Sequence, residues 1–238
     1  MAVESLYREP APADDEIAHG ALEFHDVFKI FRSGPAETVA LRGLDLRIEQ
    51  HELVAVFGPS GSGKSTMLSL AAALDEPSAG EVRALGRSLT RLDETQLARY
   101  RARDIALVFQ SDNLWPLLSA RENIVLGLNL AGRGRDEGAI DRAIDAFDLR
   151  PRERRAAGAL SGGEQQRVAV AAAAARGAAL VLADEPTAEL DEANEERVLH
   201  GLSQLREEFG STVVVVTHSE RVAEAADRVI EFRDGRTV

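Results

Sequence analysis

One stretch decides the fold of this chain: Gly58-Pro59-Ser60-Gly61-Ser62-Gly63-Lys64-Ser65-Thr66. It fits the pattern G-x-x-x-x-G-K-[ST] of phosphate-binding loops without a mismatch. The glycines allow successive backbone N–H groups to turn inward and approach phosphate oxygens closely. Lys64 is one of two lysines beside twenty-six arginines, and its compact ammonium fits between phosphates where a planar guanidinium does not. The alternative is a chance match, which occurs in roughly one chain of this length in a hundred.

The segments on either side of this loop support the same prediction. Residues 52–57 (ELVAVF) form an apolar, β-branched run that is typical of a buried strand, and a helical pattern begins at Ser65. A strand, a glycine loop and a helix N-terminus together point backbone N–H groups and the positive helix end at an anion. The sequence therefore predicts a binding site for a nucleoside triphosphate.

Length and composition exclude several other classes of protein. With 238 residues the chain can bury a full core, and without cysteine it forms neither disulfides nor cysteine-based metal sites. A formal charge of -12 disfavours broad binding to nucleic acid. Residues 1–20 are acidic and contain Pro10 and Pro12 but no apolar core, which predicts a disordered tail rather than an export signal. The longest nearly apolar stretch, residues 168–183, is too interrupted to cross a bilayer, so a soluble cytoplasmic protein is expected.

The order of the apolar runs predicts an α/β fold. Two antiparallel strands are expected at residues 22–31 and 38–48, around a turn at residues 33–35. Three later runs are typical of buried parallel strands joined by helical sequence, and they lie at residues 53–57, 180–183 and 213–216. Residues 112–176 have a mostly helical pattern, which predicts a helical subdomain, and Asp234-Gly235 predicts a final turn.

Two adjacent carboxylates follow the apolar run that begins at Leu180. Side chains that are adjacent on a strand point in different directions, so Asp184 and Glu185 can have separate roles. We expect Asp184 to hold Mg²⁺ beside the Ser65 hydroxyl, and Glu185 to polarise the attacking water. The alternative is an ordinary acidic turn after a core strand.

A second motif has the sequence Leu160-Ser161-Gly162-Gly163-Glu164-Gln165-Gln166-Arg167. Ser161 is a typical helix N-cap, the glycine pair permits close approach, and a long alanine-rich helix is expected behind it. The helix start is therefore a second expected anion site. By itself the motif is weak, because any capped helix can begin in this way.

Together these motifs resemble the nucleotide-binding subunits of ATP-binding cassette (ABC) transporters, over about residues 22–238. The resemblance implies a P-loop NTPase core with a mostly parallel sheet, an antiparallel β subdomain and a helical subdomain at about 112–176, within an ATPase domain at 21–238. It also implies ATP and Mg²⁺ as cofactors, and a dimer with a second ATPase subunit.

The resemblance assigns roles position by position. ATP would be bound by Gly58, Ser60, Gly61, Ser62, Gly63, Lys64, Ser65 and Thr66. Ser161, Gly162 and Gly163 match the signature motif of the family and would contact the γ-phosphate held by the other subunit. Asp191 lies in the loop that crosses the dimer interface. Gln110, at the end of an expected strand at 105–109, would sense Mg²⁺ and the water, and His218 would bind the γ-phosphate. Phe31 would stack on adenine.

Each of the last three assignments has an alternative. Gln110 alone is a polar residue at a strand end, and His218 alone is more often a capping or surface histidine. Phe28 lies on the opposite strand face and competes with Phe31, which is favoured by its position before the turn. The order of the motifs along the chain supports the whole set.

Three further stretches resemble the lipoprotein-releasing, macrolide-exporting and cell-division ATPases of this family. They are residues 110–116 (QSDNLWP), 122–123 (EN) and 183–187 (ADEPT). The resemblance implies that an integral membrane partner docks near Leu114, Trp115, Leu117 and Leu118, and that the ATPase lies on the inner face of the membrane. The alternative for these apolar residues is a buried hairpin inside the helical subdomain.

Four residues depart from the pattern of the family. Glu164 adds a negative charge where the signature usually ends in Gln, and His51 stands where Gly is common, which is compatible with a positive φ. Ala172 replaces a frequent Arg, and Glu189 is unusual in the interface loop.

The resulting prediction is an ATPase subunit that drives a separately encoded membrane partner, in export, lipoprotein release or mechanotransmission. One alternative is an importer subunit for amino acids or similar solutes. Another is a soluble cassette ATPase that acts on DNA or ribosomes; such proteins usually have two cassettes or coiled-coil insertions, which are not evident in this sequence.

Overall fold

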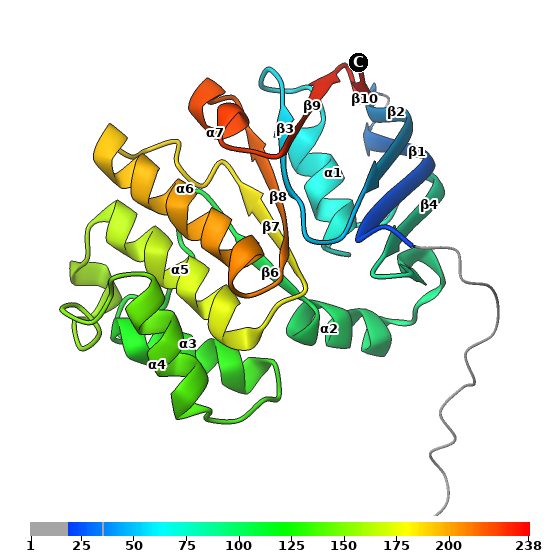
Figure 1. The fold of residues 1–238 in the computed structure, drawn as a ribbon. Helices are drawn as coiled ribbons and strands as arrows, with labels where there is room; N and C mark the ends of the chain where they lie inside the picture. Colours follow the sequence, from blue (N-terminus) through cyan, green and yellow to red (C-terminus); the bar gives the residue numbers. More distant parts are fainter. Residues whose placement is uncertain (1–18, 35) are drawn as a thin grey trace, which may run out of the picture.

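The computed structural model describes residues 19–34 and 36–238. Most of the tail predicted at residues 1–20 therefore lies outside the described residues. The described chain contains a six-stranded sheet, a four-stranded sheet and a group of helices on one side (Figure 1). None of the helices in the described ranges is both long and apolar enough to cross a membrane.

The six-stranded sheet contains the three parallel strands expected from sequence. Its strands lie in the order β10 (Arg236–Thr237), β9 (Arg228–Arg233), β3 (Leu53–Phe57), β8 (Thr212–Thr217), β7 (Leu180–Asp184) and β6 (Ile105–Val108). All neighbours are parallel except β10, which pairs antiparallel with β9. The predicted parallel strands are thus confirmed to within a residue at each end.

The four-stranded sheet is antiparallel, as predicted for its first two strands. Its order is β2 (Ala36–Ile48), β1 (Leu22–Ser33), β4 (Ala79–Ala84) and β5 (Arg87–Ser88). The helices are α1 (Lys64–Ala71), α2 (Glu94–Arg103), α3 (Ala120–Leu130), α4 (Glu137–Ala146), α5 (Gly162–Arg176), α6 (Glu192–Glu207) and α7 (Glu220–Glu224), with 3₁₀ turns η1 (Leu89–Arg91) and η2 (Ala157–Ala159).

The parallel strands bury side chains on both faces. On β7, Leu180 and Leu182 join a core with α1 and the antiparallel sheet, whereas Val181 and Ala183 join a second core with α3 to α7. Strand β8 alternates in the same way. Helix α1 therefore lies between the two sheets, and α5 and α6 cover the opposite face of the parallel sheet (Figure 1). A β-branched run without polar alternation is the sequence pattern that this double burial requires.

Two glycines of the phosphate-binding loop allow close packing against neighbouring strands. A Cβ at Gly58 would lie 2.2 Å from the carbonyl oxygen of Phe232, and one at Gly63 would lie 2.5 Å from that of Ala40. Gly63 also has φ 105°, which L side chains rarely adopt. Strands β9 and β2 thus pack directly against the loop and restrict its conformation.

His51, in the turn between β2 and β3, has a φ of 62°. The structure thus shows the positive φ with which a histidine at this position is compatible. Its ring Nδ1 lies 2.7 Å from the carbonyl oxygen of Gly210 and donates to it, which compensates for part of the backbone strain.

We expect Gly58→Ala to lower the free energy of unfolding by about 2 kcal/mol or more, because the new methyl group meets a backbone carbonyl that is fixed in a sheet. Chemical denaturation of the nucleotide-free chain measures this. Gly138→Ala in α4 is a matched control, since its nearest contact would be the end of the Asp136 side chain at 3.3 Å and not a fixed backbone atom, and alanine favours helix. Equal stability of the two variants would contradict the packing argument.

Candidate active site

The predicted site residues converge because parallel strands end at the same edge of the sheet. The phosphate-binding loop follows β3, Glu185 follows β7, His218 follows β8, and Phe109-Gln110 follow β6. These four strands are consecutive neighbours. The carboxyl edge of such a sheet is where α/β proteins bind ligands.

Lys64 is the buried cation of the loop. Its side chain is largely buried, and its Nζ donates to the carbonyl oxygens of Gly58 (2.6 Å) and Pro59 (3.0 Å). The hydroxyl of Ser62 is buried without a hydrogen-bond partner among the described residues. An ammonium at a helix N-terminus, together with a polar group that lacks a partner, fits a phosphate ligand.

Ser65 and Asp184 come together from α1 and β7. The Ser65 hydroxyl donates to Asp184 Oδ1 over 3.3 Å. Burial raises the pKa of Asp184 above its ordinary value, the hydrogen bond from Ser65 opposes this rise, and the charge of Glu185 adds to it. A hydroxyl beside a partly desolvated carboxylate is the kind of oxygen pair that a hard divalent cation binds.

Glu185 points to a different partner, as expected for adjacent carboxylates. Its φ of 47° is unusual for a residue other than glycine. Its Oε1 accepts from His218 Nδ1 over 2.8 Å, and its Oε2 accepts from the His218 backbone N–H over 3.4 Å. Because a carboxylate only accepts, His218 carries its proton on Nδ1. A strained backbone that aims a carboxylate is typical of functional sites.

Gln110 lies next to a residue that the sequence reasoning did not pair with it. Its Nε2 donates to Glu189 Oε1 over 3.0 Å. Within the described ranges no hydrogen bond joins Gln110 to Ser65 or Asp184, the two residues with which it was expected to form the metal site. Glu189, whose contacts could not be inferred from sequence, is thus the partner of the Gln110 side chain.

Ser161 caps α5, as its sequence context predicts. Its hydroxyl accepts from the Glu164 backbone N–H, and Glu164 Oε2 accepts from the Ser161 N–H over 3.0 Å. Glu164 Oε1 also accepts from Arg152 Nε over 2.9 Å. Burial raises the pKa of Glu164, but the hydrogen bonds from Ser161 and Arg152 outweigh it and lower the pKa overall. The charge of this unusual residue is therefore neutralised locally.

The signature glycines contact α6 and the loop before it. A Cβ at Gly163 would lie 2.6 Å from Asn194, and one at Gly162 would lie 3.5 Å from Leu190. Asp191 caps α6 through the Asn194 backbone N–H. Among the described residues, no hydrogen bond joins Ser161 or the two glycines to the loop at 58–66. The structure thus brings the signature together with Asp191 and not with Lys64.

Phe31 is the exposed aromatic of β1. It is 45% exposed, and the Nζ of Lys29 lies 5.0 Å from its ring centroid. Phe28 is half-buried and packs near Gly43. The other lysine of the chain is structural, since Lys29 Nζ also pairs with Asp75 over 2.6 Å. Exposure favours Phe31 over Phe28 as a surface on which a base can stack.

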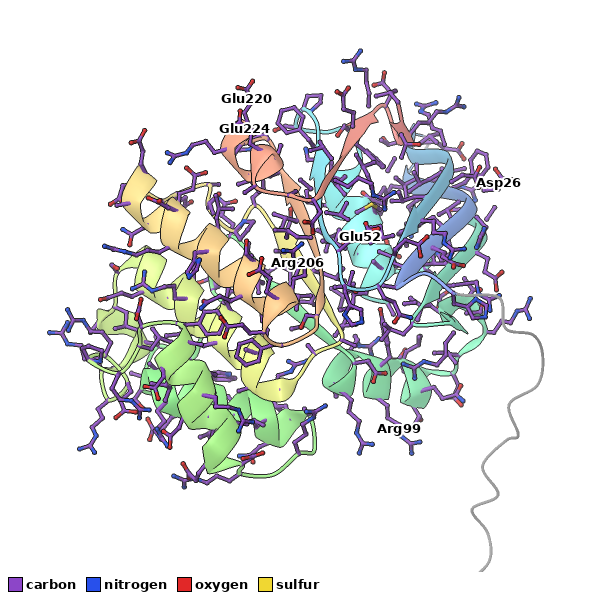
Figure 2. All side chains as sticks on the ribbon, viewed as in Figure 1. Asp26, Glu52, Arg99, Arg206, Glu220 and Glu224 are labelled. Carbon is purple, nitrogen blue, oxygen red and sulfur yellow. The ribbon has the colours of Figure 1, made fainter. Side chains whose placement is uncertain are left out.

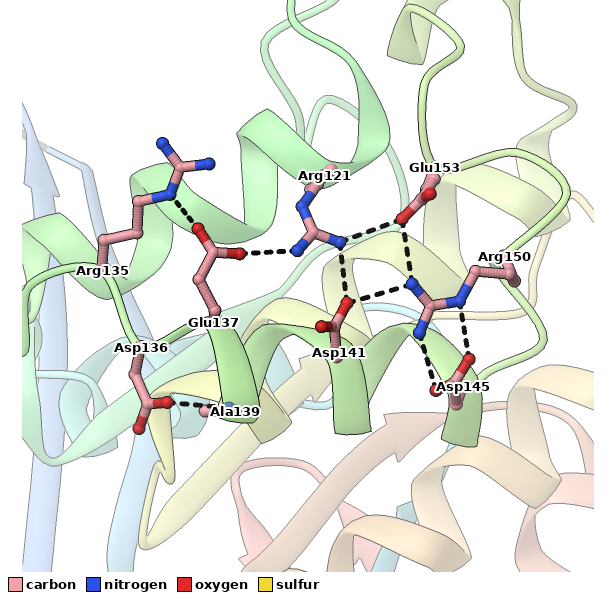
Figure 3. A network of polar contacts seen from close by, with 9 residues as sticks. All are labelled: Arg121, Arg135, Asp136, Glu137, Ala139, Asp141, Asp145, Arg150 and Glu153. Carbon is pink, nitrogen blue, oxygen red and sulfur yellow. Dashed lines mark hydrogen bonds and ion pairs between the residues drawn. The ribbon is translucent and has the colours of Figure 1, made fainter.

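A network of ion pairs holds the segment that leads from α4 to the signature (Figure 3). Arg121 on α3 and Arg150 after α4 both pair with Asp141 and with Glu153. Arg121 also pairs with Glu137, and Arg150 with Asp145. Shared charges in a network are more effective than isolated surface pairs. They fix α3, α4 and residues 150–153 to one another.

Comparison with known proteins identifies the family. The family described as "ABC transporter" matches residues 41–188. The chain belongs to the ABC transporter family. A lipoprotein-releasing system ATP-binding protein, LolD of Anaeromyxobacter dehalogenans, is 41% identical over 94% of this chain and 95% of its own length. An uncharacterised ABC transporter ATP-binding protein of Methanocaldococcus jannaschii, MJ0796, is 41% identical over 90% of this chain and 94% of its own length.

A third relative is much longer than this chain. The macrolide export ATP-binding/permease protein MacB of an Azoarcus species is 41% identical over 91% of this chain, which spans only 33% of that protein. Among solved structures, MJ0796 as a dimer bound to ADP and Pi has a TM-score of 0.82 and 38% identity, over 91% of this chain and 96% of that one. This ABC chain is therefore an ATPase with the P-loop fold that its sequence predicts, and the resemblance to the lipoprotein-release and macrolide-export subgroup is confirmed.

Sequence analysis did not identify two exposed apolar residues and one buried glutamine near the site. Leu74 and Phe109 are 55% and 44% exposed and line one small gap beside Ser65 and Asp184. Gln166 is buried and donates to the backbone carbonyl oxygen of Gln110. The only sequence feature that could have indicated Gln166 is its place as the second glutamine after Glu164. No sequence pattern predicts that Leu74 is exposed.

We expect Asp184→Asn to stabilise the nucleotide-free chain at pH 7.5 by about 1 kcal/mol. Because the folded-state pKa is raised, the penalty for the buried carboxylate grows as the pH rises through the ordinary Asp pKa and is complete above the folded-state pKa, and asparagine removes this penalty. Below the ordinary Asp pKa of about 3.9 both states are protonated, so the gain should shrink as the pH falls toward that value. Thermal unfolding across this range measures the effect.

Glu224→Gln on α7 is the control for removal of one exposed negative charge (Figure 2). A gain that is the same for both variants, or the same at every pH, would contradict the role of burial.

Proposed function

We propose that this ABC ATPase closes as a dimer on two molecules of ATP and that closure drives a membrane partner. The observation that carries this proposal is the separation of two half-sites on one chain. Lys64 and the Ser65–Asp184 pair lie at the carboxyl edge of the sheet, whereas Ser161 and Asp191 have no hydrogen bond to that loop within the described residues. A second copy would supply the missing half to each site, and the related MJ0796 cassette was solved as a dimer.

The phosphate-binding half of each site would be built by residues 58–66. Lys64 would exchange its two carbonyl partners for phosphate oxygens, as its charge and burial favour. The loop N–H groups and the Ser62 hydroxyl would complete the cradle, and Phe31 would stack on adenine. Residues 161–163 and Asp191 would close over the nucleotide of the partner subunit. We infer a single ATPase domain at residues 21–238 for this work, with its helical subdomain at about 112–176.

The two carboxylates would divide the chemistry. Ser65 and Asp184 are placed to hold Mg²⁺, with Gln110 as a further ligand once it leaves Glu189. When bound, Mg²⁺ neutralises charge that develops on the phosphates. Glu185 would orient the attacking water and accept its proton, and His218 would hold the Glu185 carboxylate in place through Nδ1.

Exposed apolar residues between β6 and α3 are the proposed docking surface. Trp115 and Leu117 are 66% and 92% exposed, which the buried-hairpin alternative does not explain. Leu114 and Leu118 are half-buried, and Leu114 packs against the core, so the alternative holds in part for them. We extend the surface to Phe109, because it is exposed at the start of the same segment.

The segment that carries this surface, residues 109–119 between β6 and α3, is the proposed docking segment, and it has a defined shape. Asn123, which is buried, accepts from the Trp115 N–H over 2.8 Å and donates to the carbonyl oxygens of Trp115 and Leu118. The Gly158 N–H donates to the carbonyl oxygen of Pro116 over 2.9 Å. A rigid, partly aromatic surface loses little entropy on binding. An integral membrane protein, bound from the cytoplasmic side, is the proposed occupant.

The kind of work is inferred from the relatives. Two of them carry names for lipoprotein release and macrolide export, which favours an export, lipoprotein-release or mechanical role over solute import. The specificity for the transported or controlled substrate would lie in the membrane partner.

We expect Glu185→Gln to reduce kcat by about 10²-fold or more, because a general base contributes that much. Binding of ATP should persist, and the variant should accumulate as an ATP-dependent dimer in size-exclusion chromatography with light scattering. Glu224→Gln should hydrolyse ATP normally. Turnover by Glu185→Gln within a few-fold of wild type would refute the assigned base.

We expect Trp115→Asp to weaken binding of the membrane partner by about 30-fold, the effect of losing an aromatic anchor. The isolated ATPase activity should stay within twofold. Co-purification with an integral membrane protein from solubilised membranes measures the interaction. Leu130→Asp is the matched control, because Leu130 at the end of α3 is also 66% exposed. Equal losses in both variants would place the docking surface elsewhere.

A further inference from the structure

The segment between β6 and α3 carries Gln110 near one end and the proposed docking residues near the other. Its first residues are held by a side chain from α5. Gln166 Nε2 donates to the carbonyl oxygens of Phe109 (2.8 Å) and Gln110 (2.7 Å). Gln166 Oε1 accepts from Asn113 Nδ2 over 2.9 Å. One carboxamide therefore uses both donors and its acceptor on this segment.

Asn113 completes the arrangement. Its Oδ1 accepts from the Phe109 N–H over 2.7 Å, and its Nδ2 also donates to the Phe109 carbonyl oxygen over 2.7 Å. Gln166 is only 4% exposed. A polar network that is anchored on a buried side chain, with every donor and acceptor of that side chain satisfied, is costly to rearrange. Residues 109–113 are thus fastened to α5 by side-chain hydrogen bonds.

The same helix begins at the signature. Gln166 lies five residues after Ser161, and α5 runs without interruption from Gly162 to Arg176. Five helical residues span about 7.5 Å. A helix over this distance moves as one body, so a displacement of residues 109–113 is passed to Ser161 through Gln166.

The side chain of Gln110 has more freedom than its backbone. It is exposed and bonded only to Glu189 in the described structure. A cavity of about 240 Å³ adjoins it, lined among others by Gly162, Gln165 and Leu190. The amide can therefore leave Glu189 and turn to a new partner while Gln166 keeps the backbone of Gln110 in place.

We propose that Gln166 is a positioning residue, which holds the backbone of Gln110 and the start of the docking segment to the helix that carries Ser161. This inference rests on the proposed function. It implies that three parts move together, namely the docking segment, Gln110 with its proposed role at the metal, and the signature. Gln166 would act through these hydrogen bonds, because its side chain is buried and its donors and acceptor are already used.

Hydrogen exchange of the nucleotide-free chain tests the physical attachment. In Gln166→Leu we expect the Phe109 amide to exchange at least tenfold faster, because Asn113, which accepts this N–H, is no longer held by Gln166, and the carbonyl oxygens of Phe109 and Gln110 lose their donor. Gln166→Glu keeps the side-chain size and the acceptor oxygen but removes both N–H donors, so we expect the same faster exchange as in Gln166→Leu. Gln204→Leu on α6 is the control, since Gln204 bonds only Glu208 in the described structure. Exchange within twofold of wild type in both Gln166 variants would overturn the proposal.

The functional test uses the Glu185→Gln background. Adding Gln166→Leu should raise the ATP concentration for half-maximal dimerisation at least tenfold, while binding of a fluorescent ATP analogue to the monomer stays within twofold. Unchanged dimerisation despite faster exchange would reduce Gln166 to a structural residue and overturn the proposal. If Glu185→Gln forms no dimer, the proposed function fails. Gln166 is then judged by kcat in the otherwise wild-type chain, and an unchanged kcat overturns its role.

Discussion

The whole structure depends on the burial of the central parallel strands on both faces. Strands β3, β7 and β8 present apolar side chains alternately to two cores. Each face then needs a layer of its own: α1 with the antiparallel sheet on one side, and α5 with α6 on the other. Since parallel strands need a connection that returns to the starting end, every loop that leaves a carboxyl end meets at one edge. The active site is the product of that constraint.

The site is held in a conformation that costs free energy without nucleotide. Asp184 is a partly buried carboxylate with a raised pKa, and Glu185 has a strained backbone. Lys64 turns its ammonium to two carbonyl oxygens. A triphosphate with a divalent cation would supply anions to Lys64 and a positive charge to Asp184, and so would relieve the penalty on the buried carboxylate. Stability that is withheld from the free chain would then contribute to nucleotide binding.

The residues outside the nucleotide loop form a second level of organisation. Ion pairs of Arg121 and Arg150 fix the approach to the signature, and Asn123 fixes the proposed docking segment. Arg152 neutralises Glu164, so the departure from the usual signature leaves the helix cap intact. These contacts explain how a helical region can carry both an exposed apolar surface and the capped start of α5 without losing its shape.

The sequence predicted the elements whose signal is local. The strand, loop and helix around Lys64, the double-buried strands and the cap at Ser161 were all correct, because each rests on residues within about ten positions of one another. It did not predict β4, β5, β9 or α2. Strand β9 is only alternately buried, and α2 has a polar surface, so neither has an apolar run. The predicted pairing of Gln110 with the metal site was not found, since Glu189 takes its amide.

By itself the sequence determined the nucleotide loop, the paired acids, the family and the order of the motifs, because short segments with fixed spacing carry those properties. Only the tertiary structure decided which side chains meet. Gln110 and Glu189 are 79 positions apart, and Gln166 and the Gln110 carbonyl are 56 apart. The spacing of residues along the chain does not predict such contacts. They arise when strands that are distant in sequence become neighbours in the sheet and bring their loops to one edge.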